Sequence, residues 1–241
     1  MFDSGFADNG GNMLEIKATI AGISAQMKIS ELDMNKTGID IKNGYVKSLG
    51  NAVLRREDSK VIAALAALSP KVTPTKPTTA VGTECKGIQV ADYSTDANAK
   101  KIIAEIRKAH AYAKLTPDNH RGLAFIISAE EWAQLSTCNY VLDMDYASVF
   151  GGGSNGEPST FFGAEIIIVD HDTNIGGATK VSYLVPSNSV CFAEFEGSMS
   201  GTAEFFATDG RKWHLQAYKS VGVAVAESHV ITKISTAAVT A

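Results

Sequence analysis

The chain has few of the residues from which metal centres, disulfide frameworks and membrane spans are built. Its three cysteines, Cys85, Cys138 and Cys191, are widely spaced and form no CxxC pair or Cys/His cluster. An odd number of isolated cysteines argues against a disulfide framework and predicts small buried thiols in a reducing compartment. No apolar run approaches the roughly 20 residues of a transmembrane helix, and the polar start MFDSGFADNGGN predicts no signal peptide.

The chain also lacks the basic excess of a general nucleic-acid-binding protein. It holds 22 Lys and Arg against 26 Asp and Glu, a net charge of −4, so broad basic patches are not expected. The charge is uneven, because residues 1–120 carry 16 basic and 13 acidic side chains whereas residues 121–241 carry 6 and 13. The two halves, at +3 and −7, are therefore expected to face different electrostatic surroundings.

What is present is enough apolar sequence for a real core. The 241 residues are 45% hydrophobic and 20% charged, which excludes disorder by composition and fits one large domain or two small intertwined ones. Near the N-terminus, apolar residues alternate with polar ones over 14–20 and again over 25–29, on either side of Gly22. This period of two predicts a β-hairpin over 13–33. Since no neighbouring segment would cover the hairpin, we expect it to pair with another subunit.

From about Val46 the period changes to that of a helix. Apolar residues fall at steps of four and three, which predicts one face of a long helix that ends before Ser69–Pro70. The threonine- and proline-rich segment 70–87 is then expected to be an extended connector and the best internal boundary. The positions of the predicted helical stripe are Leu54, Asp58, Val61, Leu65 and Leu68.

The rest of the chain is predicted to hold two helices and many strands. Ser94, Thr95 or Asp96 would cap a helix that stops at Thr116–Pro117. Its apolar stripe comprises Ile102, Ile103, Ile106, Ala109, His110 and Ala113. A buried strand over 123–128 leads into a short helix, which Ser128 and Glu131 would open with a capping box. Strands are then expected over 165–169, 181–185, 190–195, 203–207, 212–218, 221–226 and 229–234.

No catalytic, cofactor-binding or metal-binding site is predicted from these elements. The Gly-rich loop GGGSNG at 151–156 has no following lysine and precedes a strand, so it does not fit a phosphate-binding loop. The serines of Gly197–Gly201 are not in the G-x-S-x-G frame of a hydrolase elbow. Closely spaced carboxylates suit hard cations. Two carboxylates separated by two positions are common by chance, however, and these residues are better interpreted as acids at turns and strand ends. The carboxylates and histidine concerned are Asp143, Asp145, Asp170, His171 and Asp172.

The remaining titratable residues point to packing or interfaces. His110 lies on an apolar helical stripe, which is typical of a packed or interface histidine. His214 and His229 lie on strands that could be neighbours, with Glu227 nearby, but catalysis through them is the weaker interpretation. Asp58 is a carboxylate on an apolar stripe, and an unpaired buried charge is costly. We therefore hypothesise that Asp58 finds its partner in another subunit.

The order of these elements resembles that of tailed-phage major capsid proteins of the Hong Kong 97 type, over about residues 13–236. MLEIKATIAGISAQMKIS would be the extended hairpin called the E-loop, and KSLGNAVLRREDSKVIAALAAL the spine helix. ANAKKIIAEIRKAHAYAKL, LAFIIS and AEEWAQL would build the axial domain, and AYKSVGVAVAESHVITKI the closing strands. The resemblance implies an α+β capsid fold with four parts, namely an N-terminal segment with the hairpin over 1–45, a peripheral-domain part with spine helix and connector over 46–91, an axial domain over 92–198, and closing peripheral-domain strands over 199–241.

The resemblance implies a structural protein and not an enzyme. Such a subunit self-assembles through hexamers and pentamers into an icosahedral virion shell around phage double-stranded DNA, which it would contact only non-specifically. It would be made in the bacterial cytoplasm, and portal, scaffolding or decoration proteins are possible partners. The chain is short for this family and is expected to lack an N-terminal arm. No lysine or asparagine is assigned to the crosslink that some relatives form.

Two other interpretations stay open. The same fold is used by encapsulin nanocompartments, so a shell around a cargo enzyme is the alternative. A small-molecule enzyme of the α+β class would need convergent titratable residues in a pocket, and the sequence offers none. For a virion shell, we expect the more basic part, especially the long helix, to face the interior.

Overall fold

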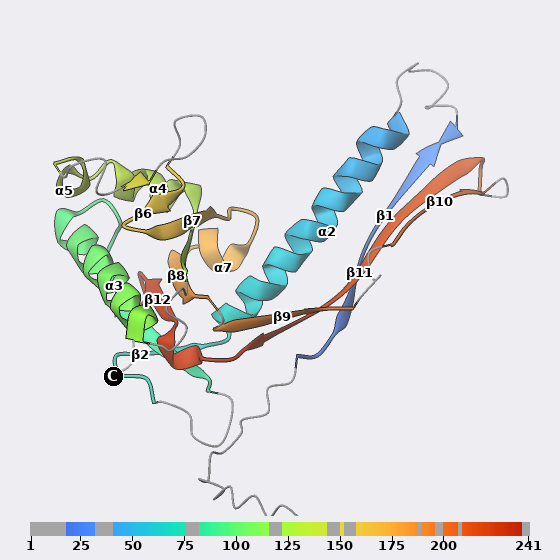
Figure 1. Cartoon of the computed structure of the whole chain (residues 1–241). Coiled ribbons are helices and arrows are strands. Elements are labelled where there is room, and N and C mark those ends of the chain that lie inside the picture. Colours follow the sequence, from blue (N-terminus) through green and yellow to red (C-terminus); the bar gives the residue numbers. More distant parts are fainter. Residues whose placement is uncertain are drawn as a thin grey trace, which may run out of the picture.

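The computed structural model describes residues 18–31, 41–75, 82–115, 122–143, 150–151, 158–187, 189–195, 200–206 and 209–237. They form a body, built around one mixed sheet, and an arm in which a second sheet runs beside a long helix (Figure 1). None of the described helices is long and apolar enough to cross a membrane. The chain has the α+β character that the resemblance to capsid proteins implies.

The body sheet has eight strands in the order β2-β3-β12-β8-β4-β7-β6-β5. The β2–β3, β3–β12 and β4–β7 pairs are parallel and the others antiparallel. Its strands are β2 (Ser69–Lys71), β3 (Glu84–Gln89), β4 (Leu123–Ile127), β5 (Phe150–Gly151), β6 (Thr160–Phe161), β7 (Ala164–Ile168), β8 (Val181–Pro186) and β12 (Thr232–Ser235).

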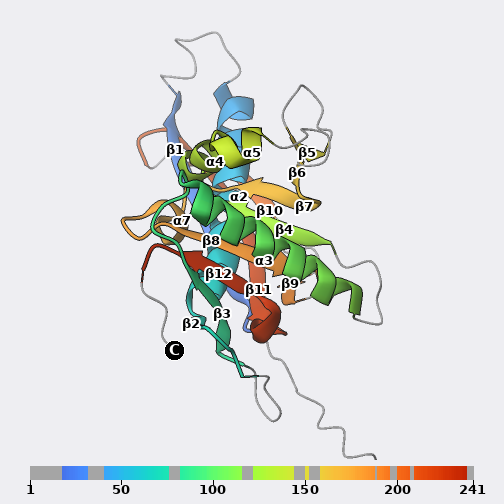
Figure 2. The ribbon, with the colours of Figure 1, turned by 90° about the vertical axis from the view of Figure 1, so that its left-hand side faces the viewer.

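Helices cover both faces of the body sheet. On one face lie α3 (Asp96–Leu115), α4 (Ala129–Ser136) and α5 (Asn139–Leu142), and Figure 2 shows α3 crossing the strands. On the other lie α7 (Thr173–Gly176) and the C-terminal part of α2 (Ile41–Ala66). Successive side chains of β4 point to opposite faces of the sheet. Phe125 and Ile127 pack in the hydrophobic cluster beneath α3, and Ile126 packs in the cluster beneath α2.

The arm sheet is antiparallel and is organised by one long strand. β11 (Lys212–Val225) pairs with β1 (Ala21–Ser30) along one edge and with β10 (Ser200–Phe206) along the other. β9 (Val190–Glu194) continues the β10 edge, since Val221 is paired with both Ala21 of β1 and Glu194 of β9. The 3-10 helix η2 (Ser228–Val230) then joins β11 to β12 of the body.

Helix α2 is the element that the arm and the body share. Its 26 residues span about 39 Å at 1.5 Å per residue. Leu49 and Val53 pack on the arm sheet, whereas Ile62 and Leu65 lie in the body core. The arm is therefore held to the body by one continuous helix and by β11 (Figure 1).

The predicted N-terminal hairpin is wrong where the structure can be compared with it. Residues 21–30 form one strand, 18–20 have no strand structure, and 14–17 lie outside the described residues. Gly22 lies inside β1 and makes no turn. A Cβ there would lie 2.9 Å from the Tyr218 ring, so glycine allows this close approach. The strand is also covered within its own chain, because Ile23 and Ile29 pack beneath α2 and pair with β11.

Most of the other elements are confirmed, with shifted ends. The long helix starts at Ile41 and not near Val46. The capping box of α4 forms as predicted, with Ser128 Oγ accepting from Glu131 N at 3.2 Å. The strands predicted over 212–218 and 221–226 are one strand, β11. The segment predicted as a strand over 229–234 is divided between η2 and β12.

Candidate assembly surfaces

A buried group of charges joins the long helix to the arm sheet. The Lys219 ammonium of β11 lies 2.5 Å from a Glu57 carboxylate oxygen of α2 and 3.2 Å from one of Glu194 of β9. Lys219 and Glu57 are each only 8% exposed. The hydrogen bond that the ammonium donates to Glu57 holds the pKa of Lys219 above its usual range, so the ammonium stays charged despite burial. One lysine therefore ties three elements together where α2 passes over the sheet.

The predicted burial of Asp58 is wrong, because the buried face of the helix is offset by one residue in this part, whereas Leu65 further along is buried as predicted. Leu54 is 48% exposed and the Asp58 side chain 58% exposed, so neither lies on the buried stripe. The carboxylate on that stripe is Glu57. Asp58 needs no partner from another subunit to offset burial, since it is solvated and lies 3.7 Å from His171 of its own chain.

The end of the arm is closed by ion pairs between distant parts of the sequence. Asp209 accepts from Lys28 of β1 at 2.8 Å and lies 2.9 Å from His214 Nε2 of β11. The hydrogen bonds from Lys28 and His214 lower the pKa of Asp209 to about 2. Arg211 Nε donates to Glu31 at 2.6 Å. These contacts fix the β10–β11 turn against the end of β1.

The arm sheet exposes large apolar side chains on β9, on β10 and on its central strand β11. Phe192 of β9, Phe205 and Phe206 of β10 and Tyr218 of β11 are all exposed, as is Phe195 after β9. All six residues of β10 from Gly201 to Phe206 are exposed, and the strand pairs only with β11 among the described residues. Monomeric proteins usually protect such an edge with charges, proline or a covering segment. The β10 edge is therefore a candidate contact surface.

The body holds one carboxyl group whose ionisation is strongly affected by its surroundings. Glu131, in the capping box of α4, is 1% exposed. Burial raises its pKa to about 7, although hydrogen bonds from Ser128 oppose this. Its neighbour Glu130 is exposed and pairs with Lys180 at 3.1 Å. Glu131 caps the helix that directly follows the inner strand β4, so its charge bears on body stability.

The candidate metal ligands have local structural roles. Asp143 ends α5 as its C-cap, and Asp145 lies outside the described residues. Asp170 Oδ1 accepts from Ala129 N at 2.7 Å, and Asp172 caps α7 by accepting from Asn174 N at 2.8 Å. Within the described ranges no group of three or more His, Cys, Asp or Glu side chains could hold a metal ion. Asp143, Asp170 and Asp172 thus lie at helix ends and after a strand, whereas the prediction for Asp145 is untested.

The candidate catalytic histidines are not brought together. His214 lies on the arm sheet beside Asp209, whereas His229 lies in η2 of the body and Glu227 precedes that turn. His110 is half-buried on α3 near Gly163. Of the Gly-rich loop only Gly151 is described, in β5, and of the Gly197–Gly201 segment only Ser200 and Gly201, in β10.

The three cysteines are free thiols. Cys85 and Cys138 are buried, as predicted, and burial raises the pKa of Cys85 to about 11. Cys191 is exposed on β9, so the expectation of a buried thiol is wrong there. It lies at the edge of the sheet, where the side chains of β9 receive little cover.

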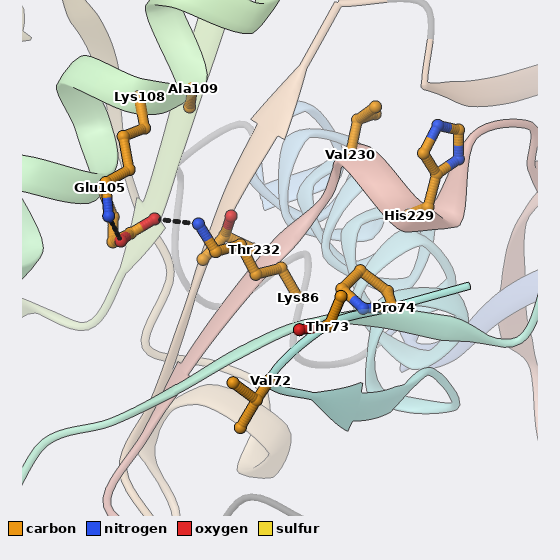
Figure 3. A pocket seen from close by; sticks show the side chains of 10 residues that line it. All are labelled: Val72, Thr73, Pro74, Lys86, Glu105, Lys108, Ala109, His229, Val230 and Thr232. Atoms are coloured by element: carbon orange, nitrogen blue, oxygen red, sulfur yellow. Dashed lines mark hydrogen bonds and ion pairs between the residues drawn. The ribbon is translucent and has the colours of Figure 1, made fainter. Parts of the chain in front are cut away.

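A pocket of about 290 Å³ lies where β3, α3, η2 and the segment after β2 meet. Lys86 of β3 and Glu105 of α3 point toward one another across it and form an ion pair (Figure 3). Lys108 donates to the same carboxylate at 2.6 Å. Burial acts to raise the pKa of Glu105, but the two lysines lower it, so the carboxylate stays charged. Apolar parts of the lining come from Val72, Pro74, Ala109 and Val230.

Sequence reasoning missed both the Lys219 cluster and this pocket. One signal for the first was available, because Lys219 falls at an inward position of the alternating segment around Trp213, Leu215 and Ala217. A lysine there requires a carboxylate partner. The pocket had no comparable signal, since its residues come from four separate segments.

Comparison with known proteins identifies the family. Residues 14–202 match the family described as phage capsid protein. No curated protein matches the chain. Among solved structures, that of Mycobacterium phage Che8 matches with a TM-score of 0.62 at 13% identity, over 89% of this chain and 70% of the other. The capsid of an empty GTA particle matches with a TM-score of 0.62 at 15% identity, over 92% and 74%.

A third match is the capsid of Helicobacter pylori bacteriophage KHP30, with a TM-score of 0.56 at 12% identity, over 92% of this chain and 76% of that one. At such identities these likenesses show the fold, and the family match carries the assignment. The encapsulin alternative is not favoured, because the matched family is that of phage capsids. The chain belongs to the phage capsid protein family and is a major capsid protein with the Hong Kong 97-like fold of tailed phages.

Proposed function

We propose that this subunit closes into the icosahedral shell of a virion by contacts through its arm, and that it is made in the cytoplasm of the host bacterium. The single observation that carries the proposal is the β10 edge, which is exposed, apolar and unpaired among the described residues. Contacts between different patches on identical subunits close into rings when the rotation allows. The fivefold and sixfold capsomers of such a shell are rings of this kind.

The four-part division into an N-terminal segment, two peripheral parts and an axial domain stays a proposal. It is supported by the separation of arm and body, but β12 from the closing segment pairs with β8 of the axial one. The proposed boundaries therefore divide the sequence into segments, but they do not divide the structure into separate sheets. Portal, scaffolding and decoration proteins are further proposed partners, and a structural role without catalysis accords with the family.

The assembly proposal is tested with the purified full-length chain. Size-exclusion chromatography with light scattering and negative-stain electron microscopy should show closed particles or capsomer-sized rings. A nuclease-resistant DNA content in particles from infected cells would separate a virion from a cargo shell. A monomer or dimer at all protein and salt concentrations, also with co-expressed phage proteins, would contradict the proposal.

The exposed residues of α2 are proposed to face the lumen. Lys47, Arg55, Arg56 and Lys60 are all exposed along the helix, against one exposed acid, Asp58, although Arg56 also donates to Ser24 O of β1 at 2.9 Å. Confined DNA needs only non-specific charge neutralisation at such a surface. The double variant Lys47→Glu/Lys60→Glu should assemble normally and package less DNA, measured as nuclease-protected DNA per particle. Unchanged packaging by this variant would argue that another face is lumenal.

A further inference from the structure

We infer that the start of helix α4 is a pH-sensitive switch in the body of the subunit. While the Glu131 carboxyl is protonated, the capping box stays closed and α4 stays packed on the body sheet. When the carboxyl ionises, α4 opens locally and the rest of the body keeps its fold. The inference goes beyond the proposed shell function, because the switch acts in a single unassembled subunit as well as in a particle.

The Glu131 carboxyl is enclosed without the partners that its ionised form needs. The residue is 1% exposed. Ser128 N donates to Oε2 across 3.5 Å, which is long for a hydrogen bond, and Oε1 has no hydrogen-bond partner among the described residues. A buried carboxylate oxygen without a partner costs far more free energy than a buried neutral carboxyl. The enclosure therefore favours the protonated form.

The charged groups around the start of α4 also disfavour a negative charge on Glu131. Asp170, which follows β7, accepts from Ala129 N at 2.7 Å, and the exposed Glu130 is the adjacent residue. A helix N-terminus favours one negative charge, but Asp170 already supplies it here. The cation that faces this group is Lys180, before β8, and its ammonium lies 3.1 Å from Glu130. Ionised Glu131 would thus be a third carboxylate where Lys180 is already paired.

Tyr93, in the segment before α3, is the other titratable group near Glu131. Its buried hydroxyl shares a hydrogen bond with Ser182 Oγ at 2.8 Å. Burial above all, and the charge of Glu131, raise the pKa of Tyr93 although that hydrogen bond opposes the rise, so the phenol stays neutral and supplies no counter-charge. Burial likewise raises the pKa of Glu131 to about 7, against the opposing effects of Ser128 and Lys180. Geometry and pKa agree that Glu131 ionises inside the closed body only near neutral pH.

Helix α4 can open without unfolding the sheet beneath it. It has only eight residues, and helices this short depend on their packing for stability. Its hold on the body includes Leu135, in the hydrophobic cluster beneath α3, and the Trp132 ring, edge-on to Phe161 at 5.4 Å between centroids. Strand β4 lies between β8 and β7, so its ladder does not depend on α4. The first turn of α4 is therefore where ionisation acts.

The inference is tested by native-state hydrogen exchange of the purified full-length subunit, followed by mass spectrometry at low urea concentrations. After correction for the intrinsic effect of pH on exchange, opening of α4 should increase on the order of fifty-fold between about pH 5 and 8. The reason is that Glu131 ionises at its ordinary pKa in the open form but at about 7 in the closed form. Low urea should hardly affect the exchange of α4, because local opening exposes little surface, whereas the exchange of β4 should follow global unfolding.

Three variants identify the group responsible. Glu131→Gln should remove the increase and keep α4 protected at pH 8. Lys180→Met should move the increase to higher pH, because the cation that favours ionised Glu131 is lost. Glu130→Gln is the matched control, since it changes the exposed neighbouring acid and should keep the increase. Thermal unfolding checks that each variant is folded.

Three results would overturn the inference. One is an increase that persists in Glu131→Gln. Another is a shift to lower pH in Lys180→Met, which keeps the test decisive if Glu131→Gln does not fold. The third is exchange of α4 with the same urea dependence as β4, which would show that α4 opens only when the whole body unfolds.

Discussion

Replacing Lys219 by methionine should destabilise the subunit more than the loss of an ordinary lysine. The ammonium is the counterion of Glu57, which is 8% exposed. Removing one partner of a buried pair leaves an uncompensated charge and costs about 3–5 kcal/mol. Glu194 adds little, because its side chain is 43% exposed and such pairs contribute about 0–1 kcal/mol. We therefore expect a loss near the lower end, about 3 kcal/mol.

The assay is urea unfolding of the unassembled subunit, followed by circular dichroism. The midpoint should fall with little change in slope, since the surface exposed on unfolding is similar. A loss of this size corresponds to a melting temperature lower by about 6–12 °C for a chain of this length. Lys28→Met is the matched control, because that lysine pairs with Asp209 but its side chain is 59% exposed. Its effect should stay within about 1 kcal/mol.

A second variant tests the cause. In Glu57→Gln/Lys219→Met no buried charge remains between α2 and β11, so most of the stability should return and the two changes should be strongly non-additive. Because Glu57 raises the pKa of Lys219, the contribution of the pair should persist below the usual lysine pKa and be lost only as the pH rises through the higher folded value. A loss below about 1 kcal/mol in Lys219→Met, or additive effects in the double variant, would refute the reasoning.

Further predictions concern the body and the end of the arm. Burial raises the pKa of Glu131 to about 7, so its contribution to stability is complete at acidic pH and is lost as the pH rises through about 7. Glu131→Gln should flatten the melting temperature between about pH 5 and 8, and an unchanged slope would exclude Glu131 as the cause. Asp209→Asn removes a carboxylate whose pKa is lowered to about 2. It should speed amide exchange in β11 near Lys212 and His214 while leaving the exchange of β4 unchanged, and equal rates in both proteins would show that the ion pairs do not hold the turn.

Local sequence signals predicted the elements whose partners are close in the chain. The capping box of Ser128 and Glu131 acts over three residues, and α3 follows the spacing of Ile102, Ile106 and Ala109. Gly22 was different, because a glycine is needed at this position to make room for the Tyr218 ring of β11. A glycine between two alternating segments reads locally as a turn. Only the β1–β11 pairing shows that it makes room for an aromatic ring.

The error over Asp58 has a related cause. Steps of four and three assume one flat stripe of period 3.5, whereas a straight helix drifts relative to such a stripe. Helix α2 also packs on two different layers, with Leu49 and Val53 on the arm and Ile62 and Leu65 in the body. Its buried face therefore passes through Glu57. No local pattern could show that one helix packs on two sheets. Each sheet includes a strand from near the C-terminus, β11 in the arm and β12 in the body, which is far from α2 in the sequence.

The division of the core explains why the arm is suited to making contacts. Among the described residues its two clusters contain three buried apolar side chains each, Ile23, Val53 and Val221 in one and Ile29, Leu49 and Leu215 in the other. The body buries two much larger clusters on both faces of its sheet. Regions with few buried contacts open at lower free energy than the core. A neighbour that covers the exposed phenylalanines of the arm, as the proposed assembly requires, would bind the ordered arm and stabilise it by mass action.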